Sequence, residues 1–325
     1  MIFSIAITGP TASGKTGLSL ALAKRLSGEI ISADSMQIYK RMDIGTAKAT
    51  EEERDAVPHH LLDFVSPLEN YSVECYRAAA LSRAEEITSR GKLPMLVGGT
   101  GLYVSSLLRA DQADTPGSDA EYREKILASL KTDEDIDALW QRLHSVDPDS
   151  AEAIHKNNVK RVIRALEIYD KTGITKTELD RRSREGRAEI FVGMITLDFH
   201  SRDTLYSRID QRVDIMVDDG LFDEVKALYD EGLLREGTTA AQAIGYKEII
   251  EYLRGRCTPE EAIAEIKLAS RRYAKRQLTW FRHTEGVYTL YMDDEAGNMR
   301  PTEEIIAEAE EAYESFLCEY KATLR

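Results

Sequence analysis

Short apolar runs alternate along the chain with longer stretches of helical periodicity. The first run is rich in β-branched residues, and each is short enough to be a strand buried on both faces of a parallel sheet. The runs lie at 2–7, 29–33, 93–97 and 189–195. We expect the main helices at 18–28, 71–90, 157–170, 204–220, 258–283 and 301–325. Strands that alternate with helices predict the α/β class with a parallel sheet.

The pattern changes between the third and fourth runs. From about residue 114, some seventy residues are almost wholly helical in pattern, until 189–195 restores the strand pattern. We therefore expect an inserted all-helical subdomain at 116–188, with 1–115 and 189–325 forming the α/β core. The helix expected at 157–170 is the best of this insertion, and Gly173 follows its end.

A glycine-rich motif directly follows the first run and precedes a helix. It fills the pattern G-x-x-x-x-G-K-[ST] at every fixed position, and strand, loop and helix in this order form a phosphate cradle. Lys15 would supply positive charge, and Thr16 could ligate Mg²⁺. The motif consists of Gly9, Pro10, Thr11, Ala12, Ser13, Gly14, Lys15 and Thr16. It predicts a P-loop NTPase-like core, of the kind found in ATP-binding proteins, that binds a di- or triphosphate.

Two further segments follow predicted strands and should reach the same edge of the sheet. Asp34 follows the second run, and as a residue type it could be a Mg²⁺ ligand, a general base or a turn-former. Gly98, Gly99 and Thr100 follow the third run, where a P-loop NTPase usually carries a Mg²⁺-binding acid. The missing acid weakens the prediction of an ordinary ATPase.

Composition and charge limit the classes of function. The 325 residues have a net charge of −14 and 42% hydrophobic residues, and no apolar run approaches the length of a membrane span. We see no signal peptide, and three scattered cysteines indicate reduced thiols, so we expect a cytoplasmic protein. Two stretches reverse the acidic balance: 156–187 has ten bases and five acids, and 267–282 has six bases and no acid.

The basic residues gather on helix faces. On the helix at 157–170, residues Asn157, Lys160, Arg161 and Arg164 share one arc, opposite apolar residues. In the second stretch the cations, among them Arg272 and Arg276, fall on one half of the helix, and Tyr273 and Trp280 fall on the packing half. Such a face can be either a solvated surface or a binding site for a polyanion.

Taken together, these motifs resemble the tRNA dimethylallyltransferases of bacterial type. The matching segments are 9–16 (GPTASGKT), 34–48 (DSMQIYKRMDIGTAK), 58–63, 71–73, 96–103 (LVGGTGLY), 160–167 (KRVIRALE), 172–173, 242–248 (QAIGYKE) and 274–282 (AKRQLTWFR). At 156–158 the chain departs from the family pattern, because Lys-Asn-Asn stands where a proline and an aspartate are expected. This departure leaves the cap of the following helix in question.

The resemblance implies transfer of a dimethylallyl group from dimethylallyl diphosphate to the exocyclic N6 amine of the adenosine next to the anticodon in tRNA. The P-loop would then hold a diphosphate leaving group, which explains the missing acid. Lys15, Thr100 and Mg²⁺ on Thr16 would stabilise the charge of the diphosphate, with help from Arg212, and Asp34 would accept a proton.

The expected partner is the anticodon stem-loop of tRNA, bound by a chain that we expect to be monomeric. The family pattern and the basic faces together predict a set of tRNA-binding residues. They are Asp34, Ser35, Met36, Gln37, Thr100, Arg123, Asn158, Lys160, Arg161, Arg164, Gln242, Gly245, Lys247, Arg272 and Arg276. Two alternatives remain open: a kinase or isopentenyltransferase that acts on a small molecule or free nucleotide, and an RNA-binding NTPase switch.

Overall fold

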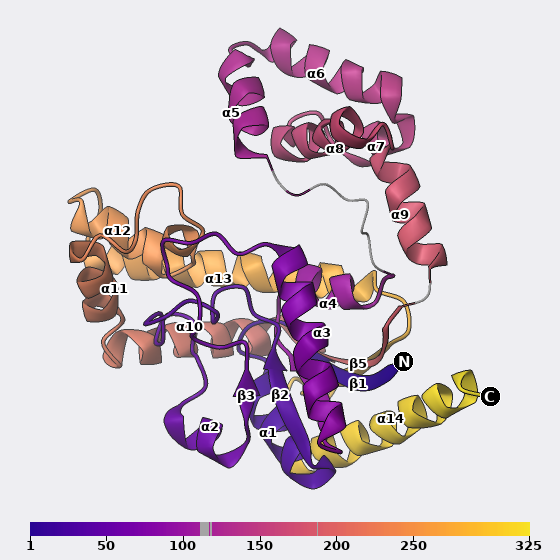
Figure 1. Cartoon of the computed structure of the whole chain (residues 1–325). Coiled ribbons are helices and arrows are strands. Elements are labelled where there is room, and N and C mark those ends of the chain that lie inside the picture. Colours follow the sequence, from indigo (N-terminus) through magenta and orange to yellow (C-terminus); the bar gives the residue numbers. More distant parts are fainter. Residues whose placement is uncertain (111–116, 118, 187) are drawn as a thin grey trace. The chain divides into compact units, whose positions relative to one another are not determined.

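A computed structural model describes residues 1–110, 117, 119–186 and 188–325. It contains a six-stranded sheet with the order β3-β2-β4-β1-β5-β6, and every pairing between neighbouring strands is parallel (Figure 1). The strands are β1 (Ile2–Thr8), β2 (Gly28–Ser32), β3 (His59–His60), β4 (Leu93–Val97), β5 (Ile190–Asp198) and β6 (Val287–Tyr291). The predicted α/β class and parallel sheet are confirmed. The edge strand β6 was not predicted; only Leu290 of its five residues is buried, so it lacks the continuous buried apolar run of the central strands.

Helices account for most of the remaining described chain. Within the described residues no helix combines the length and apolar character that crossing a membrane requires. The helices are α1 (Lys15–Leu26), α2 (Glu51–Ala56), α3 (Val73–Ser89), α4 (Gly101–Leu107), α5 (Ala120–Ser129), α6 (Asp133–Val146), α7 (Pro148–Ala153), α8 (Val159–Thr172), α9 (Lys176–Glu185), α10 (Arg202–Asp218), α11 (Leu221–Asp230), α12 (Tyr246–Leu253), α13 (Pro259–Arg282) and α14 (Thr302–Thr323).

Local capping chemistry explains where several helices begin. The Ser72 side chain accepts a hydrogen bond from the Cys75 amide at the start of α3. Thr258 and Glu261 form a capping box at the start of α13, with a proline in the first turn. At the start of α8, by contrast, the Asn158 side chain makes no capping hydrogen bond to the described residues. The departure from the family pattern at 156–158 thus coincides with a helix start that lacks a side-chain cap.

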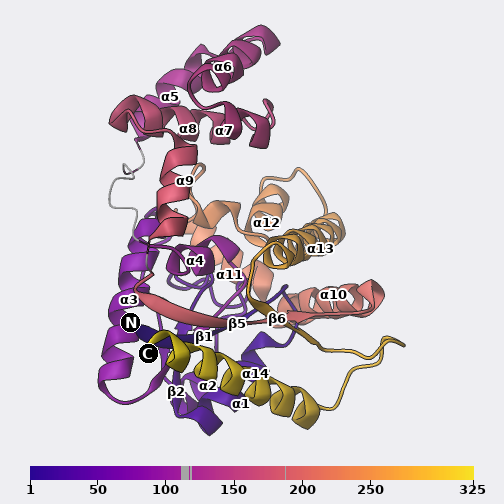
Figure 2. The same cartoon turned by 90° about the vertical axis from the view of Figure 1, so that its right-hand side faces the viewer.

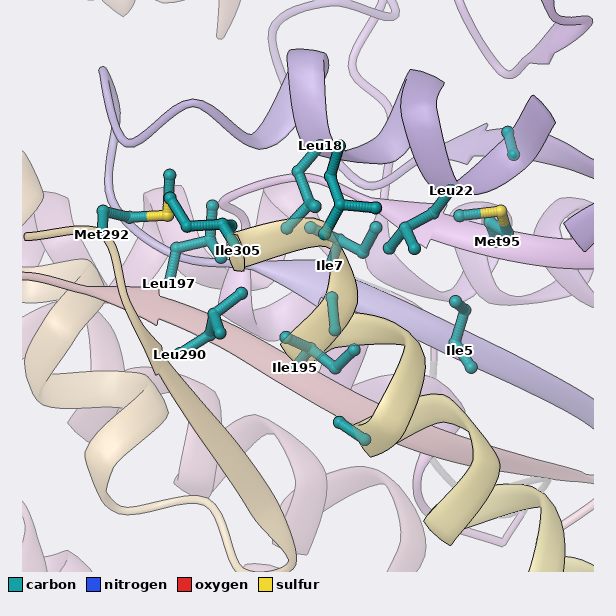
Figure 3. Packing of buried hydrophobic residues seen from close by; sticks show 14 of the residues in the cluster. Ile5, Ile7, Leu18, Leu22, Met95, Ile195, Leu197, Leu290, Met292 and Ile305 are labelled. Carbon is teal, nitrogen blue, oxygen red and sulfur yellow. The ribbon is translucent and has the colours of Figure 1, made fainter. Parts of the chain in front are cut away.

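Two helical layers cover the sheet. On one face, α1 and α14 pack Leu18, Leu22 and Ile305 against Ile7 and Ile195 of the central strands (Figure 3). On the other face, α3 and α4 pack against the same strands. A third apolar cluster joins α10, α11, α12 and α13 to the segment after β2. The sheet is therefore buried on both faces, as its apolar strands require.

The acidic C-terminal helix is part of this core. Helix α14 lies along β5 and contacts α1, with Ile305, Ile306, Ala309 and Phe316 buried (Figure 2). Gly193 of β5 has no side chain, and a Cβ there would approach the Phe316 ring to 2.5 Å. Removing α14 would therefore expose the apolar face of the sheet.

The chain divides into two compact units. The first comprises 1–108 and 190–325, and the second comprises 109–189, which contains α5 to α9. The second unit has an apolar core of its own, formed by Leu143, Ala151, Val162 and Leu166 among others. The expected domain boundary at 115/116 lies outside the described residues.

Candidate diphosphate and acceptor site

The glycine-rich motif forms a tight turn between β1 and α1. Gly9 and Gly14 have positive φ angles of 135° and 93°. A Cβ on Gly9 would lie 2.7 Å from the Leu197 carbonyl oxygen, so only glycine fits there. The N-terminus of α1 and the motif from Thr11 to Thr16 line a cavity of about 420 Å³. A helix N-terminus and a loop of this form are suited to binding an anion.

Cationic side chains converge on this cavity. The Lys15 Nζ donates hydrogen bonds to the carbonyl oxygens of Gly9 (3.1 Å) and Pro10 (2.6 Å). Arg208 Nε donates to the Ala12 carbonyl oxygen at 3.0 Å. Arg212 also lines the cavity, and its buried Nε has no hydrogen-bond partner among the described residues; the same holds for the Ser13 hydroxyl. Buried polar groups normally have partners, so these two groups indicate a site for a ligand oxygen.

Burial and mutual repulsion perturb the charges of these cations. Burial and, to a smaller extent, the neighbouring Arg212 lower the pKa of Lys15 to about 7, and Asp34 opposes this shift. The pKa of Arg212 is also lowered, mainly by burial, with Asp34 again opposing and Arg208 contributing. Positive charges held together away from water would be stabilised by a bound anion.

Asp34 lies beside this cavity, just after β2. Its Oδ1 accepts hydrogen bonds from the backbone amides of Met36 (2.9 Å) and Gln37 (3.3 Å). Oδ2 takes part in no hydrogen bond found among the described residues. The Gln37 side chain donates to the carbonyl oxygens of Thr46 (3.2 Å) and Ala47 (3.1 Å), which holds the following loop. Asp34 is thus both a turn-former through one oxygen and a candidate base through the other.

The loop after β4 reaches the same edge of the sheet. Thr100 Oγ1 accepts a hydrogen bond from the Ser35 amide at 2.9 Å and donates to Ser35 Oγ at 3.2 Å. A Cβ on Gly98 would lie 2.2 Å from the Ala33 carbonyl oxygen, so the glycine allows this close approach of the two loops. The structure therefore brings together the P-loop, Asp34 and Thr100, as the strand order requires.

A second cavity, of about 310 Å³, adjoins the first. Both are lined by Thr11, Asp34, Thr46, Arg212 and Tyr273. Apolar side chains from α10, α11 and α13 form much of the wall of the second cavity. Its other lining residues include Ser35, Met36, Gln242, Gly245, Lys247 and Arg276, all of which were predicted from the sequence.

Several lining residues were not predicted as site residues. Tyr273 was assigned to the packing half of its helix, yet it lines both cavities. Burial and the charge of Asp34 raise its pKa to about 12, so it is a neutral phenol at pH 7. Arg208 could have been proposed from its position one turn before Arg212. Gln277 lies inside the quoted segment 274–282, but nothing in the pattern separates it from its neighbours.

In the second unit, part of the predicted tRNA-binding set is engaged in ion pairs. Arg123 and Arg164 each contact the carboxylate of Glu167 at 2.7 Å, and the Glu167 side chain is fully buried. The Arg123 contact joins α5 to α8, whereas the Arg164 contact lies within α8. A charge reversal at Arg164 would place a second carboxylate beside the buried Glu167 and so destabilise this unit. Lys160 and Arg161 are exposed on α8.

The basic face of α13 is also partly neutralised. Three of its six cations form ion pairs with Asp214 (2.6 Å), Asp210 (2.6 Å) and Asp198 (2.8 Å); they are Lys267, Arg271 and Arg282. These three acids come from α10 and β5, so about half of the basic face is neutralised within the protein. The other three cations, Arg272, Lys275 and Arg276, are exposed, and Arg272 lies 3.9 Å from the exposed Glu265 on the same helix. Trp280 is also 39% exposed instead of packed in the core, and its Nε1 donates to Ser105 Oγ at 3.0 Å.

Comparison with known proteins agrees with this architecture. The IPP transferase family matches residues 37–284, and the isopentenyl transferase family matches residues 3–69. The tRNA dimethylallyltransferase of Halalkalibacterium halodurans is 50% identical over 290 residues, which cover 89% of this chain and 91% of that protein. That of Anoxybacillus flavithermus is 49% identical over 304 residues, covering 93% of this chain and 94% of that protein.

Solved structures show the same similarity. The tRNA isopentenylpyrophosphate transferase of Bacillus halodurans has a TM-score of 0.73 and 45% identity, covering 100% of this chain and 99% of its own. A eukaryotic dimethylallyltransferase acting on tRNA has a TM-score of 0.77 and 32% identity, covering 90% of this chain and 74% of its own. The fold class and the resemblance proposed from the sequence are confirmed. The chain belongs to the IPP transferase family, the family of the tRNA dimethylallyltransferases.

Proposed function

We propose that this protein transfers a dimethylallyl group from dimethylallyl diphosphate to the N6 amine of the adenosine on the 3′ side of the anticodon in tRNA, releasing diphosphate. In this reaction the bond between C1 of the allyl group and the diphosphate oxygen breaks. A bond between C1 and N6 forms, and N6 loses a proton. The family relationship supports the reaction, and the arrangement of the two cavities supports the assignment of roles.

One observation carries the assignment: the phosphate-side cavity and the second cavity adjoin at Asp34 and Arg212. A diphosphate in the first cavity would lie against the P-loop, and an acceptor base in the second would lie next to it. The volume of about 310 Å³ is at the lower end of the range of small-molecule sites, which suits one base and a five-carbon group. The target adenine must leave its stack in the RNA to enter such a cavity.

The diphosphate would be bound by the groups that lack other partners or repel one another. Lys15, Arg212 and the Ser13 hydroxyl would donate to its oxygens, together with amides at the start of α1. The charge that develops on the leaving group increases as the C–O bond breaks, so these donors stabilise the transition state more than the ground state.

Asp34 would act as the general base. An adenine amine is a poor nucleophile because its lone pair is delocalised into the ring, so removing its proton as the new bond forms lowers the barrier. The two backbone amides on Oδ1 hold the carboxylate in place and leave Oδ2 for the substrate.

Mg²⁺ is part of the proposal, and the donor set fits it. Thr16 lies in the first turn of α1 and lines the cavity, and a hydroxyl with diphosphate oxygens and waters suits this hard cation. The described residues contain no cluster of three acidic or other metal-ligating side chains, so most ligands would come from substrate and water. When bound, Mg²⁺ supplies further positive charge to the diphosphate.

The tRNA backbone would lie on the exposed cations: Lys160 and Arg161 in the second unit, and Arg272, Lys275 and Arg276 on α13. Because salt screens charges beyond about 8 Å, the net charge of −14 does not prevent local binding of a polyanion. The proposal includes a monomeric state and a cytoplasmic location; for the location, three free cysteines suit a reducing compartment.

A single-turnover experiment with labelled dimethylallyl diphosphate tests the function. Label should transfer to tRNA, with little transfer to AMP, ADP or ATP. Transfer to a free nucleotide would favour an isopentenyltransferase that acts on small molecules, and phosphorylation of a small molecule would favour a kinase. Hydrolysis of ATP or GTP that RNA stimulates, without transfer of label, would favour an NTPase switch.

A further inference from the structure

A glutamine on α13 connects the two loops that form the phosphate and acceptor sides of the site. Gln277 Oε1 accepts a hydrogen bond from the Thr11 amide of the P-loop at 2.9 Å. Its Nε2 donates to the Gly99 carbonyl oxygen, in the loop after β4, at 3.0 Å. The side chain is only 5% exposed, so both hydrogen bonds lie away from bulk water. We infer that Gln277 is a positioning residue, which sets the separation between the diphosphate cradle and the loop that carries Thr100.

The chemistry of the amide makes this bridge specific. One end of a carboxamide only accepts hydrogen bonds and the other only donates them, and here each faces its complement. A glutamate in the same place could accept from Thr11 but would turn a carboxylate oxygen toward the Gly99 carbonyl. Gly99 has no side chain, and a Cβ there would lie 2.1 Å from Gln277 Nε2. The glutamine can therefore hold this position only because residue 99 is a glycine.

The bridge continues to the acceptor side. Thr100 follows Gly99 directly, and its hydroxyl holds the Ser35 amide and hydroxyl, next to Asp34. A continuous series of contacts thus runs from Thr11 through Gln277, Gly99 and Thr100 to the segment of the proposed base. Displacing one loop would change the distance between the leaving group and the acceptor.

The helix that carries Gln277 is fixed in the core. Its neighbours Ala274 and Leu278 are buried in the apolar cluster on one face of the sheet, and Phe281 is buried in the cluster on the other face. A side chain on such a helix has a well-defined position, which a side chain on a free loop lacks. Gln277 can therefore act as a spacer between the two loops.

This inference rests on the proposed function for its kinetic test. Gln277→Met keeps the approximate volume of the side chain, adds no charge and removes both hydrogen bonds. We expect the single-turnover rate of transfer to fall about 10- to 100-fold, because displacements of about 1 Å can have effects of this size. The Kd for dimethylallyl diphosphate should change less than about threefold. A larger share of the donor should be lost to water as dimethylallyl alcohol, in which a water oxygen replaces the diphosphate at C1.

Hydrogen exchange of the full chain supplies a readout that does not depend on turnover. Peptides that contain the P-loop and 98–101 should exchange faster in Gln277→Met. The neighbouring buried substitution Leu278→Met is the matched control and should leave the transfer rate and exchange nearly unchanged. If Gln277→Met does not fold, Gln277→Asn, which is one methylene too short to span both loops, should slow transfer in the same way.

The outcomes separate the two proposals. Suppose that the wild-type protein transfers label, and that the Gln277 variant transfers it within twofold of the wild-type rate with normal hydrogen exchange. This result would overturn the positioning role alone. A fall in folded fraction or melting temperature with an unchanged rate per folded molecule would also overturn it, since the role would be only structural. Wild-type protein that transfers no label would overturn the proposed function and with it the role of Gln277 in that reaction.

Discussion

The substitution Asp34→Asn tests the proposed general base most cleanly. An asparagine can still accept the two hydrogen bonds from Met36 and Gln37 through Oδ1, so the turn after β2 should persist. Asp34→Ala would remove these bonds as well, each contributing about 0.5–1.5 kcal/mol, and would mix a structural effect with a chemical one. Asp34→Asn removes the charge and the proton acceptor alone.

The structure indicates both the size and the direction of the effects. Loss of a general base typically slows a reaction about 10²- to 10⁴-fold, which corresponds to about 2.7–5.4 kcal/mol in the barrier. Binding of dimethylallyl diphosphate should change little, because two effects oppose each other. The variant removes a negative charge that repels the diphosphate, but it also removes the charge of Asp34 that raises the pKa of Lys15 and Arg212 and so favours their cationic forms. Thus the rate should collapse while affinity is kept.

Single-turnover transfer and equilibrium binding of the donor measure the two quantities separately. Asp43→Asn is the matched control: Asp43 lies in the same segment, pairs with Lys48 at 2.6 Å and is not among the residues lining the two cavities. Lys48 retains Asp63, so the control should transfer at close to the wild-type rate. Near-normal transfer by Asp34→Asn would refute the base assignment. A loss confined to tRNA affinity would show instead that Asp34 is a docking contact.

Three further predictions concern the cradle and the RNA surface. Thr16→Ala should weaken use of the donor, and raising the Mg²⁺ concentration should partly restore it; a defect independent of Mg²⁺ would contradict a metal-binding role. Lys15 has a pKa of about 7 in the free protein, so donor binding should take up a proton and weaken as pH rises above 7. Calorimetry in buffers of different ionisation enthalpy measures this uptake, and Lys15→Met should abolish that component. The double reversal Arg272→Glu and Arg276→Glu should weaken tRNA binding and flatten its salt dependence, with each lost phosphate contact worth about 0.7–0.9 in the log–log slope. The exposed control Lys321→Glu should change neither the tRNA affinity nor its salt dependence. If it weakened binding as much as the double reversal does, net charge and not a local contact would be the cause.

The lowered pKa of Lys15 also makes the free energy of unfolding depend on pH. The native pKa of about 7 lies below the ordinary value of 10.5, so between these pH values the unfolded chain binds more protons than the native protein. The contribution of Lys15 to stability is therefore unfavourable at low pH and improves as pH rises through this window.

Much of the α/β core followed from local patterns. The apolar runs at 2–7 and 93–97 became central strands, and Ser72 and Thr258 begin helices as their side chains predict. Strand β6 escaped detection because it lies at an edge, where one face is exposed and the apolar pattern is weak. The position of Asp34 and Thr100, at the carboxyl ends of their strands, followed from the rule that ligands bind at that end of a parallel sheet.

The details of the site depended on contacts that no local pattern contains. The acids that neutralise half of the basic face of α13 come from α10 and β5, far away in sequence. The pairing of Arg123 with the buried Glu167 likewise requires two helices to meet. The proposed role of Gln277 depends on its hydrogen bonds to two loops that are distant in sequence. Sequence patterns identified which residue types could act, and tertiary packing determined which of them are free to do so.

The most direct test of the account is identification of the modified nucleoside. The protein is incubated with labelled dimethylallyl diphosphate, Mg²⁺ and tRNA, and the RNA is digested and analysed by mass spectrometry. We predict one dimethylallyl group on N6 of the adenosine 3′ to the anticodon, one diphosphate released per group, and no transfer when that adenosine is replaced by guanosine. Label in free nucleotides, or RNA-stimulated hydrolysis of ATP or GTP with unmodified tRNA, would contradict the account.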